Sequence, residues 1–228
     1  MSTGRPQHDG RACDYVASSA TTYNQIKVLD QQRTTIEPDL LESLHDLFVK
    51  HKSHEYFGIS LLHRHHDMLQ GHAMVQSQVG QGVVACRMQI AKSLILYPCA
   101  FYVTNENKFV AYEYTEEPTP VPATTFLSDL SSFLVSNDLR DRLALSSIQP
   151  KVQPVEERLL AQGLGTISTP LNGELDLSDI QGTITEWSFL PHPNGRRGIR
   201  AIKKCVESQA GGHKVEDIEQ IPRGQSSP

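Results

Sequence analysis

The chain has 228 residues, of which 38% are hydrophobic, and its formal net charge is −5. A mildly acidic chain lacks the basic surplus typical of nucleic-acid-binding surfaces, so we expect no nucleic-acid partner. No apolar run approaches the roughly 18 residues that a membrane span requires, so we also expect no membrane association.

The two ends of the chain are polar and carry no periodic apolar face. Residues 1–22 and 207–228 are rich in Ser, Gly, Gln and charged side chains, a composition typical of poorly ordered tails. The stretch between them, 23–206, is long enough to bury one core. We therefore predict a single folded domain over 23–206 with a disordered tail on each side.

The cysteines and the first residues bear on the cellular compartment. The four cysteines form no CxxC pair, and residues 1–10 are polar, unlike the apolar region of a signal peptide. Cysteines in this kind of arrangement are typical of reduced cytosolic proteins. We therefore expect a cytoplasmic protein with reduced thiols.

The first predicted element is an amphipathic helix that begins at Pro38 and ends near Ser53. Proline and an acidic residue suit the first helical turn. The apolar residues that follow recur at three- and four-residue spacing: Leu40, Leu41, Leu44, Leu47 and Phe48. The same spacing places His51 on the apolar face. We predict that this face packs on a sheet.

A strand is predicted over residues 59–66. With a period of two, one face of this strand is formed by Ile59, Leu61, His63 and His65. That face begins with two aliphatic side chains and ends with two imidazoles. We therefore expect the strand to leave the core and enter a polar pocket, with His66 pointing away from it.

Hairpins, further helices and two late strands complete the predicted domain. The hairpins pair strands over 72–78 with 83–89 and over 94–103 with 109–114. Apolar spacing predicts helices over 126–143, with a break near 137–138, and over 155–162. The late strands cover 183–190 and 198–206. Grouped strands with helices before and after them indicate an α+β fold, in which helices pack on an antiparallel sheet built from hairpins.

Histidine is concentrated between residues 51 and 72, where six of the ten histidines of the chain lie. Imidazole is the commonest metal ligand and the side chain best suited to proton transfer near neutral pH. On a strand, the Cβ atoms of His63 and His65 would lie about 6.5–7 Å apart on one face. Two imidazoles at that spacing can converge on one ion. We predict that both are metal ligands and, if the protein is an enzyme, catalytic residues.

The third ligand is open at the level of the sequence. Asp67 continues an H-x-H-x-D alternation, but it would stand about 13 Å from His63 along an ideal strand. Unless the chain bends after His65, another residue must complete the site. We rank His54 and His51 above Asp67, and we consider two further candidates, His72 and Glu113.

These ligand types suit a divalent ion such as Fe(II), Mn(II) or Zn(II) and do not distinguish among the three. Our leading hypothesis is a small metal-binding protein, and specifically a metalloenzyme that acts on a small molecule. One alternative is a metal-free enzyme in which His63 or His65 is a general acid–base. Others are a non-enzymatic binding or interaction module, and histidines with a purely structural role. The pattern does not predict an oligomeric state.

One segment resembles a pattern found in a group of proteins. The run H-x-x-F-G-x-x-L-L-H-x-H, from His54 to His65, resembles a segment of an uncharacterised protein family of filamentous fungi. The resemblance extends over about residues 36–206 and includes a late W-x-F at 187–189. In this chain His66 stands where the pattern has an aromatic residue. The resemblance implies a shared domain over that range and no particular activity.

A second cluster is basic and lies in and before the last predicted strand: Arg196, Arg197, Arg200, Lys203 and Lys204. Guanidinium groups bind planar anions in two-pronged fashion, so one interpretation is a phosphate or carboxylate site. The pattern favours the other interpretation, an edge strand. Exposed cations on an edge strand discourage edge-to-edge pairing.

Overall fold

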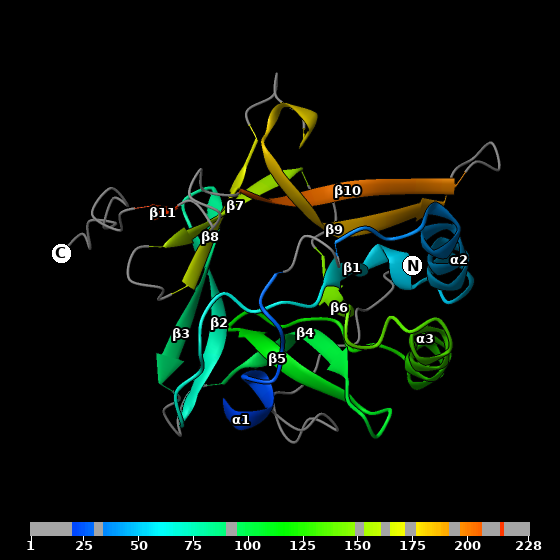
Figure 1. Cartoon of the computed structure of the whole chain (residues 1–228), viewed down its shortest axis with the longest axis horizontal. Helices are drawn as coiled ribbons and strands as arrows, with labels where there is room; N and C mark the ends of the chain where they lie inside the picture. The colour runs from blue at the N-terminus through cyan, green and yellow to red at the C-terminus, as the bar shows by residue number, and fades with distance from the viewer. Residues whose placement is uncertain are drawn as a thin grey trace, which may run out of the picture.

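The structure is a computed structural model that describes residues 20–29, 34–89, 95–148, 153–160, 165–171, 177–191, 197–206 and 215–216. Ten of its strands form a closed β-barrel, accompanied by three short α-helices among the described residues (Figure 1). The predicted α+β class is therefore wrong. The fold is predominantly β, and its sheet closes on itself instead of lying open under helices.

The barrel strands, in their order around the sheet, are β10 (Arg197–Val206), β9 (Gly182–Pro191), β1 (Phe57–Leu61), β6 (Leu143–Ser147), β4 (Tyr97–Val103), β5 (Phe109–Thr115), β2 (His72–Val79), β3 (Gly82–Gln89), β8 (Gly165–Pro170) and β7 (Val155–Leu160). The parallel pairing of β7 with β10 closes the ring, and β2 and β5 are also parallel. The short strand β11 (Val215–Glu216) pairs with the end of β7.

Three segments account for the wrong fold class. Residues 155–160, predicted as a helix, form β7, and Leu143, predicted on a helix, begins β6. Strand β8 was not predicted. Leu139 and Leu143 are both fully buried, and their four-residue spacing satisfies a helical period although the second leucine lies in a strand. Apolar runs this short do not distinguish a strand from a helix by period alone.

The barrel turns its apolar faces outward and smaller polar side chains inward. In β1, Ile59 is fully buried against the helices, whereas its neighbour Ser60 faces the barrel interior. In β6, Leu145 faces outward and Ser146 inward in the same way. Successive strand residues point to opposite faces of a sheet. The main hydrophobic core therefore lies between the barrel wall and the helices, which leaves the interior polar.

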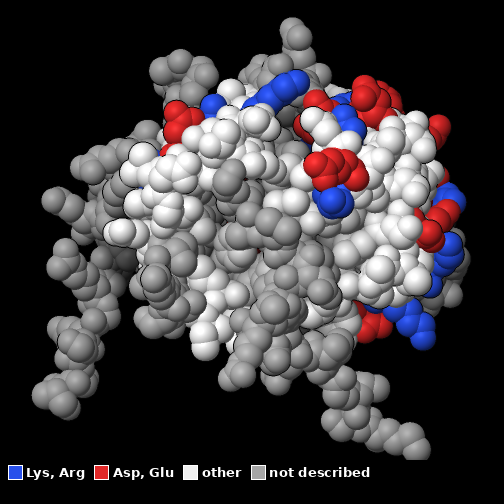
Figure 2. Space-filling view, turned by 90° about the horizontal axis from the view of Figure 1, so that it is seen from below, with Lys and Arg blue, Asp and Glu red and all other residues white. Residues whose placement is uncertain are grey.

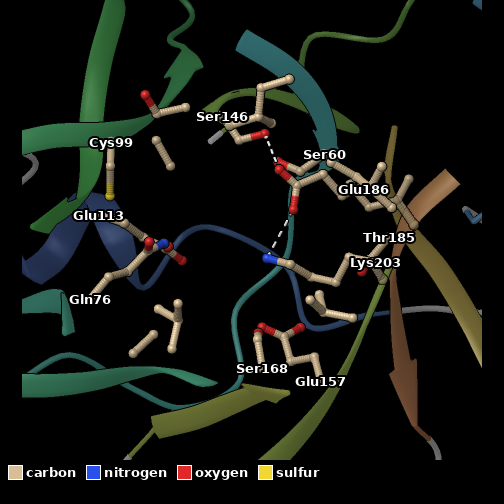
Figure 3. Close-up of a pocket in the computed structure, with 18 of the residues that line it drawn as sticks. Ser60, Gln76, Cys99, Glu113, Ser146, Glu157, Ser168, Thr185, Glu186 and Lys203 are labelled. Atoms are coloured by element: carbon tan, nitrogen blue, oxygen red, sulfur yellow. Dashed lines mark hydrogen bonds and ion pairs between the residues drawn. The ribbon is translucent and has the colours of Figure 1, made fainter. Parts of the chain in front are cut away.

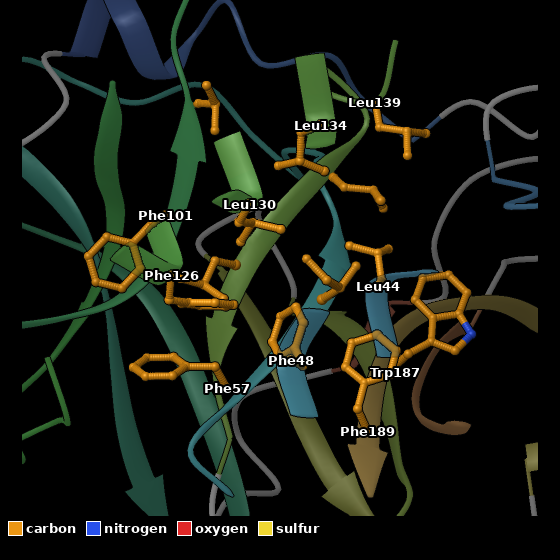
Figure 4. Close-up of a cluster of buried hydrophobic side chains, with 14 of the residues drawn as sticks. Leu44, Phe48, Phe57, Phe101, Phe126, Leu130, Leu134, Leu139, Trp187 and Phe189 are labelled. Carbon is orange, nitrogen blue, oxygen red and sulfur yellow. The ribbon is translucent and has the colours of Figure 1, made fainter. Parts of the chain in front are cut away.

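That core is organised around aromatic rings from two helices and a strand (Figure 4). The helices are α2 (Pro38–Lys50) and α3 (Thr124–Ser136). The ring of Phe48 lies 4.9 Å from that of Phe126 and 4.7 Å from that of Phe189 in β9, measured between centroids. All three side chains are fully buried, and rings at these distances attract beyond their burial alone.

The predicted hairpins are present, but their surroundings differ from the prediction. Strands β2–β3 and β4–β5 belong to the same sheet, joined through the parallel pair β2–β5. The helix predicted from Pro38 is α2. It packs chiefly on strands β9 and β10, and it also contacts α3 (Figure 1). Two one-turn helices, η2 (Ser53–Glu55) and η4 (Leu177–Asp179), lie in loops.

The predicted tails lie mostly outside the described residues. Within the predicted N-terminal tail, the short helix α1 (Ala20–Tyr23) begins at Ala20, which is buried. Strand β11 falls within the predicted C-terminal tail. The structure describes neither 1–19 nor 217–228.

Charged side chains of both signs are interspersed on the face seen in Figure 2, and neither sign forms a broad patch there. Such mixing allows ion pairs between elements, as between Lys50 of α2 and Asp129 of α3, whose charged atoms lie 2.9 Å apart. Within the described ranges, no helix combines the length and the apolar character needed to cross a bilayer.

Candidate metal centre

The barrel encloses a cavity of about 380 Å³, lined by residues from all ten barrel strands (Figure 3). Three exposed glutamines line one part of it, which marks the side open to solvent: Gln78, Gln81 and Gln153. Deeper in, the lining contains six acidic or basic side chains: His63, His65, Glu113, Glu157, Glu186 and Lys203. Such a concentration inside a fold makes the cavity the candidate functional site.

Irregular strand pairing increases the number of side chains that face this cavity. The register between β9 and β10 shifts on both sides of Lys203, and the register between β4 and β5 shifts around Ala100. A regular strand presents only alternate residues to one face. Here the neighbours Thr185 and Glu186 both line the cavity, as do Ile202 and Lys203. Bulges are known to redirect side chains in this way beside functional sites.

His63 and His65 reach the cavity from the segment that follows β1. The strand ends at Leu61, earlier than the predicted 59–66. The intervening Arg64 is held on the outer side, because its backbone N–H donates to the carbonyl of Lys27 and its Nε donates to the carbonyl of Ile26. The two imidazoles on either side of it consequently lie together, with ring centroids 4.6 Å apart.

Glu157 and Cys205 are brought to these histidines by the closure of the barrel. In the parallel pairing of β7 with β10, Glu157 stands directly opposite Cys205. The Sγ atom of Cys205 lies 3.3 Å from Glu157 Oε2, and the Nε2 atom of His65 lies 3.5 Å from the same oxygen. One ligand atom from each of the four residues lies within 4.8 Å of the other three.

Two further contacts orient these side chains. The Nδ1 atom of His63 lies 2.8 Å from the carbonyl oxygen of Leu61, an acceptor, so in neutral imidazole the proton is on Nδ1 and the lone pair on Nε2. Thr166 donates its hydroxyl to Oε1 of Glu157 at 3.2 Å. Metal-binding histidines and carboxylates are commonly fixed by such outer contacts.

Electrostatics favour an ionised Glu157. Burial alone would raise its pKa, but Lys203, the hydrogen bond with His65 and the charges of both histidines hold the pKa well below its usual range. Burial would likewise lower the pKa of Lys203, but three carboxylates raise it above its usual range: Glu186, Glu157 and Glu113. Lys203 pairs most closely with Glu186, with Nζ 3.0 Å from Oε2.

The other predicted ligands lie apart from this cluster. His51 extends from the end of α2, and its Nε2 lies 2.9 Å from Oδ2 of Asp129. His54 lies in η2, and Asp67 is 71% exposed and pairs with Arg64. His72 begins β2, with Nδ1 3.0 Å from the carbonyl oxygen of Gln70. The structure therefore brings His63 and His65 together, without His51, His54, Asp67 or His72.

The remaining candidate, Glu113, lines the same cavity but is not one of the four clustered residues. His66 lies outside the cluster, with its Nε2 3.1 Å from the Sδ atom of Met74.

The sequence pattern did not identify Glu157 or Cys205 as candidate metal ligands. Glu157 fell in a segment interpreted as a helix, although a period of two over 155–160 places it on one face with Val155 and Leu159. Cys205 fell in a predicted strand, on the same face as Lys203. No local pattern shows that these two strands pair with each other, and that pairing creates the site.

The predicted basic edge strand is also different in the structure. Strand β10 pairs on both sides, so it is not an edge. Lys203 faces the cavity, Lys204 donates to the carbonyl of Leu177 at 2.8 Å, and Arg197 binds the carboxylates of Asp46 and Glu42 on α2. These cations have intramolecular partners. Arg196 lies outside the described residues.

Comparison with protein-family models, with curated proteins and with solved structures found no match to this chain.

Proposed function

We propose that the chain binds one divalent transition-metal ion inside the barrel and uses it on a small molecule that enters the cavity. The observation that carries this proposal is the convergence of four ligand atoms from His63, His65, Glu157 and Cys205 within 4.8 Å of one another. A divalent ion would also balance the carboxylate of Glu157 and a thiolate at Cys205. Lys203, the nearby cation, is already paired with Glu186.

The donor set narrows the choice of metal. Two imidazoles, a carboxylate and a thiol form a mixed nitrogen, oxygen and sulfur set, which suits Zn(II) or Fe(II). A sulfur ligand disfavours Mn(II), which prefers oxygen. We select Zn(II), because four such donors at these separations match its tetrahedral preference.

The cavity beside the cluster supports a role beyond structural metal binding. Its volume of about 380 Å³ falls in the range of small-molecule sites. A zinc ion with three protein ligands and one open position polarises a substrate oxygen or lowers the pKa of bound water. The side chain of Cys205 determines which kind of zinc site forms. As a fourth ligand, Cys205 would complete the coordination, whereas a Cys205 that remains hydrogen-bonded to Glu157 would leave one position on the zinc open.

A second candidate function needs no metal. The Nε2 atom of His65 lies 3.5 Å from Glu157 Oε2, and the pKa of Glu157 is held well below its usual range. An ionised carboxylate beside a histidine orients the imidazole and stabilises its protonated form. His65 would then exchange protons with a ligand in the cavity as a general acid–base.

We assign this activity to a reducing compartment and propose the cytoplasm. Three cysteines in the described ranges carry free thiols: Cys86, Cys99 and Cys205. A thiol that binds metal must stay reduced, and cytosolic conditions maintain that state.

Calorimetric titration of zinc into metal-free protein without an affinity tag tests the proposal. We expect one zinc per chain, with binding lost in His63→Ala and in His65→Ala. The matched controls are His54→Ala and His66→Ala, which remove neighbouring imidazoles outside the cluster and should retain binding. Circular dichroism checks that each variant folds. Absence of stoichiometric binding by the unaltered chain would overturn the metal proposal and favour the acid–base candidate.

A further inference from the structure

A second polar group stands in the same cavity, on the wall formed by β2 and β5. These parallel strands place Met74 opposite Glu113, and Gln76 of β2 donates its Nε2–H to Glu113 Oε2 at 2.7 Å. Figure 3 shows Gln76 and Glu113 together, across the cavity from Thr185 and Glu186. The pair has no part in the metal cluster described above.

The Glu113 and Gln76 side chains together offer both donors and acceptors. Burial raises the pKa of Glu113, against the opposing effects of Lys203 and of the hydrogen bond from Gln76. The carboxyl oxygens of Glu113 accept hydrogen bonds, and the amide of Gln76 both donates and accepts them. The contact between them uses one N–H of Gln76. This wall is therefore suited to a ligand that itself carries a donor beside an acceptor.

An orphaned hydroxyl on the facing wall also points to a ligand. Thr185 is 1% exposed and lines the cavity, and its Oγ1 has no hydrogen-bond partner among the described residues. Buried hydroxyls normally have partners, because a hydroxyl that is removed from water and left unpaired destabilises the fold. A polar molecule in the cavity would satisfy it.

The charges in the cavity argue against a charged ligand. The ammonium group of Lys203 lies 3.0 Å from Glu186, which also accepts the hydroxyl of Ser146 at 2.7 Å. Glu157 contacts His65 and Cys205. Within the described lining, each ionised group already has a polar partner, so an anion or a cation would have to displace one of these contacts. An uncharged molecule could bind without displacing any of these contacts.

We propose that the Glu113–Gln76 wall is a subsite for an uncharged small molecule with a carboxamide- or lactam-type edge, in which an N–H donor stands beside a carbonyl acceptor. The subsite deepens the proposed function, since it identifies the class of molecule that would lie beside the metal cluster. Its contacts with the ligand do not involve the metal, so the two proposals can fail separately.

The test uses three probes of nearly equal shape and different charge: benzamide, benzoate and benzamidine. Saturation-transfer NMR on the metal-free full chain measures the dissociation constant of each. We expect benzamide to bind at least about tenfold more tightly than either ion, a difference of about 1.4 kcal/mol. Equal or tighter binding of benzoate or benzamidine, or no binding of benzamide, would overturn the subsite.

Variants locate the probe. Glu113→Leu should weaken benzamide binding at least about tenfold, because the hydrogen-bonding oxygens of the carboxyl group are lost. Glu113→Gln keeps an acceptor oxygen and should bind within a few-fold of the unaltered chain. Gln89→Ala, on the exposed end of β3, is the control. Unchanged binding in a folded Glu113→Leu variant contradicts the proposal. Zinc binding by the same variants should be unchanged. Titrating them with zinc therefore distinguishes a failure of the Glu113–Gln76 subsite from a failure of the metal site.

Discussion

The Sγ atom of Cys205 lies 3.3 Å from Oε2 of Glu157, the same oxygen that lies 3.5 Å from Nε2 of His65. One carboxylate oxygen therefore joins a thiol of β10 to an imidazole that follows β1, residues 140 positions apart in the chain. Without metal, the thiol keeps its proton and donates a hydrogen bond to the carboxylate. With metal, that proton is released, because a thiolate is the ligand form.

The first prediction concerns Cys205. Cobalt(II) substituted for zinc should show a thiolate-to-cobalt charge-transfer band in the unaltered chain, and Cys205→Ser should abolish it. The variant should also bind zinc at least about tenfold more weakly, because a hydroxyl is a poor substitute for a thiolate. Cys99→Ser, which changes another cavity thiol, is the control and should keep the band. A cobalt complex of the unaltered chain that lacks the band contradicts thiolate coordination.

The second prediction concerns Lys203. Its Nζ lies 3.0 Å from Glu186 Oε2, and the two side chains are 24% and 7% exposed. Lys203→Met leaves buried carboxylates without their cation, which should lower the free energy of unfolding by about 3–5 kcal/mol. Denaturant unfolding of metal-free protein measures the loss. The double variant Lys203→Met/Glu186→Gln should recover part of it, and an unchanged stability in the single variant would refute the role assigned to this pair.

The third prediction is a pH dependence at Asp46. The hydrogen bond from Arg197, followed by that with His45, lowers the pKa of Asp46 from 3.8 to about 2. Since the folded-state pKa is the lower one, the ionised carboxylate stabilises the fold fully above pH 3.8 and loses that effect as the pH falls toward 2.

Asp46→Asn should consequently be less stable than the unaltered chain at neutral pH, and the difference should shrink between pH 3.8 and 2. Thermal unfolding as a function of pH measures both. Glu117→Gln, an exposed carboxylate between β5 and α3, serves as the control. A stability difference that stays constant across this interval would contradict the interpretation.

Part of this architecture was predictable from the sequence, and the rest depends on contacts between distant segments. The apolar spacing after Pro38 predicts α2 because a helical face is a local property. The alternation around His63 and His65 predicts two imidazoles on one side, and Arg64 does point away from them. The partners Glu157 and Cys205 follow from barrel closure, which joins β7 to β10 across 48 residues and leaves no local periodicity.

The fold class was misjudged for a related reason. The apolar residues of β1 and β6 alternate as on any sheet covered on one face, so the pattern alone does not say whether the sheet is open or closed. Closure depends on the number of strands, and three of the ten, β6, β7 and β8, were not predicted. The helices pack outside the barrel, which makes its polar interior resemble a solvent-exposed face in the sequence.

The fourth prediction concerns Gly58 in β1. A Cβ atom there would lie 2.5 Å from the carbonyl oxygen of Trp187 in the neighbouring strand β9. Gly58→Ala should therefore push the two strands apart and lower the free energy of unfolding by about 1–3 kcal/mol. Denaturant unfolding measures it. Gly80→Asn is the matched control, because φ is +60° in open space there and Asn tolerates that conformation. Equal stability of both variants would contradict this close approach.

The most direct test of the metal site is an anomalous difference map from crystals of the zinc-loaded protein, recorded at the zinc absorption edge. We predict one peak in the barrel interior, bounded by four side chains: His63, His65, Glu157 and Cys205. No peak at that position, or a peak instead beside His51 and Asp129, would contradict the account.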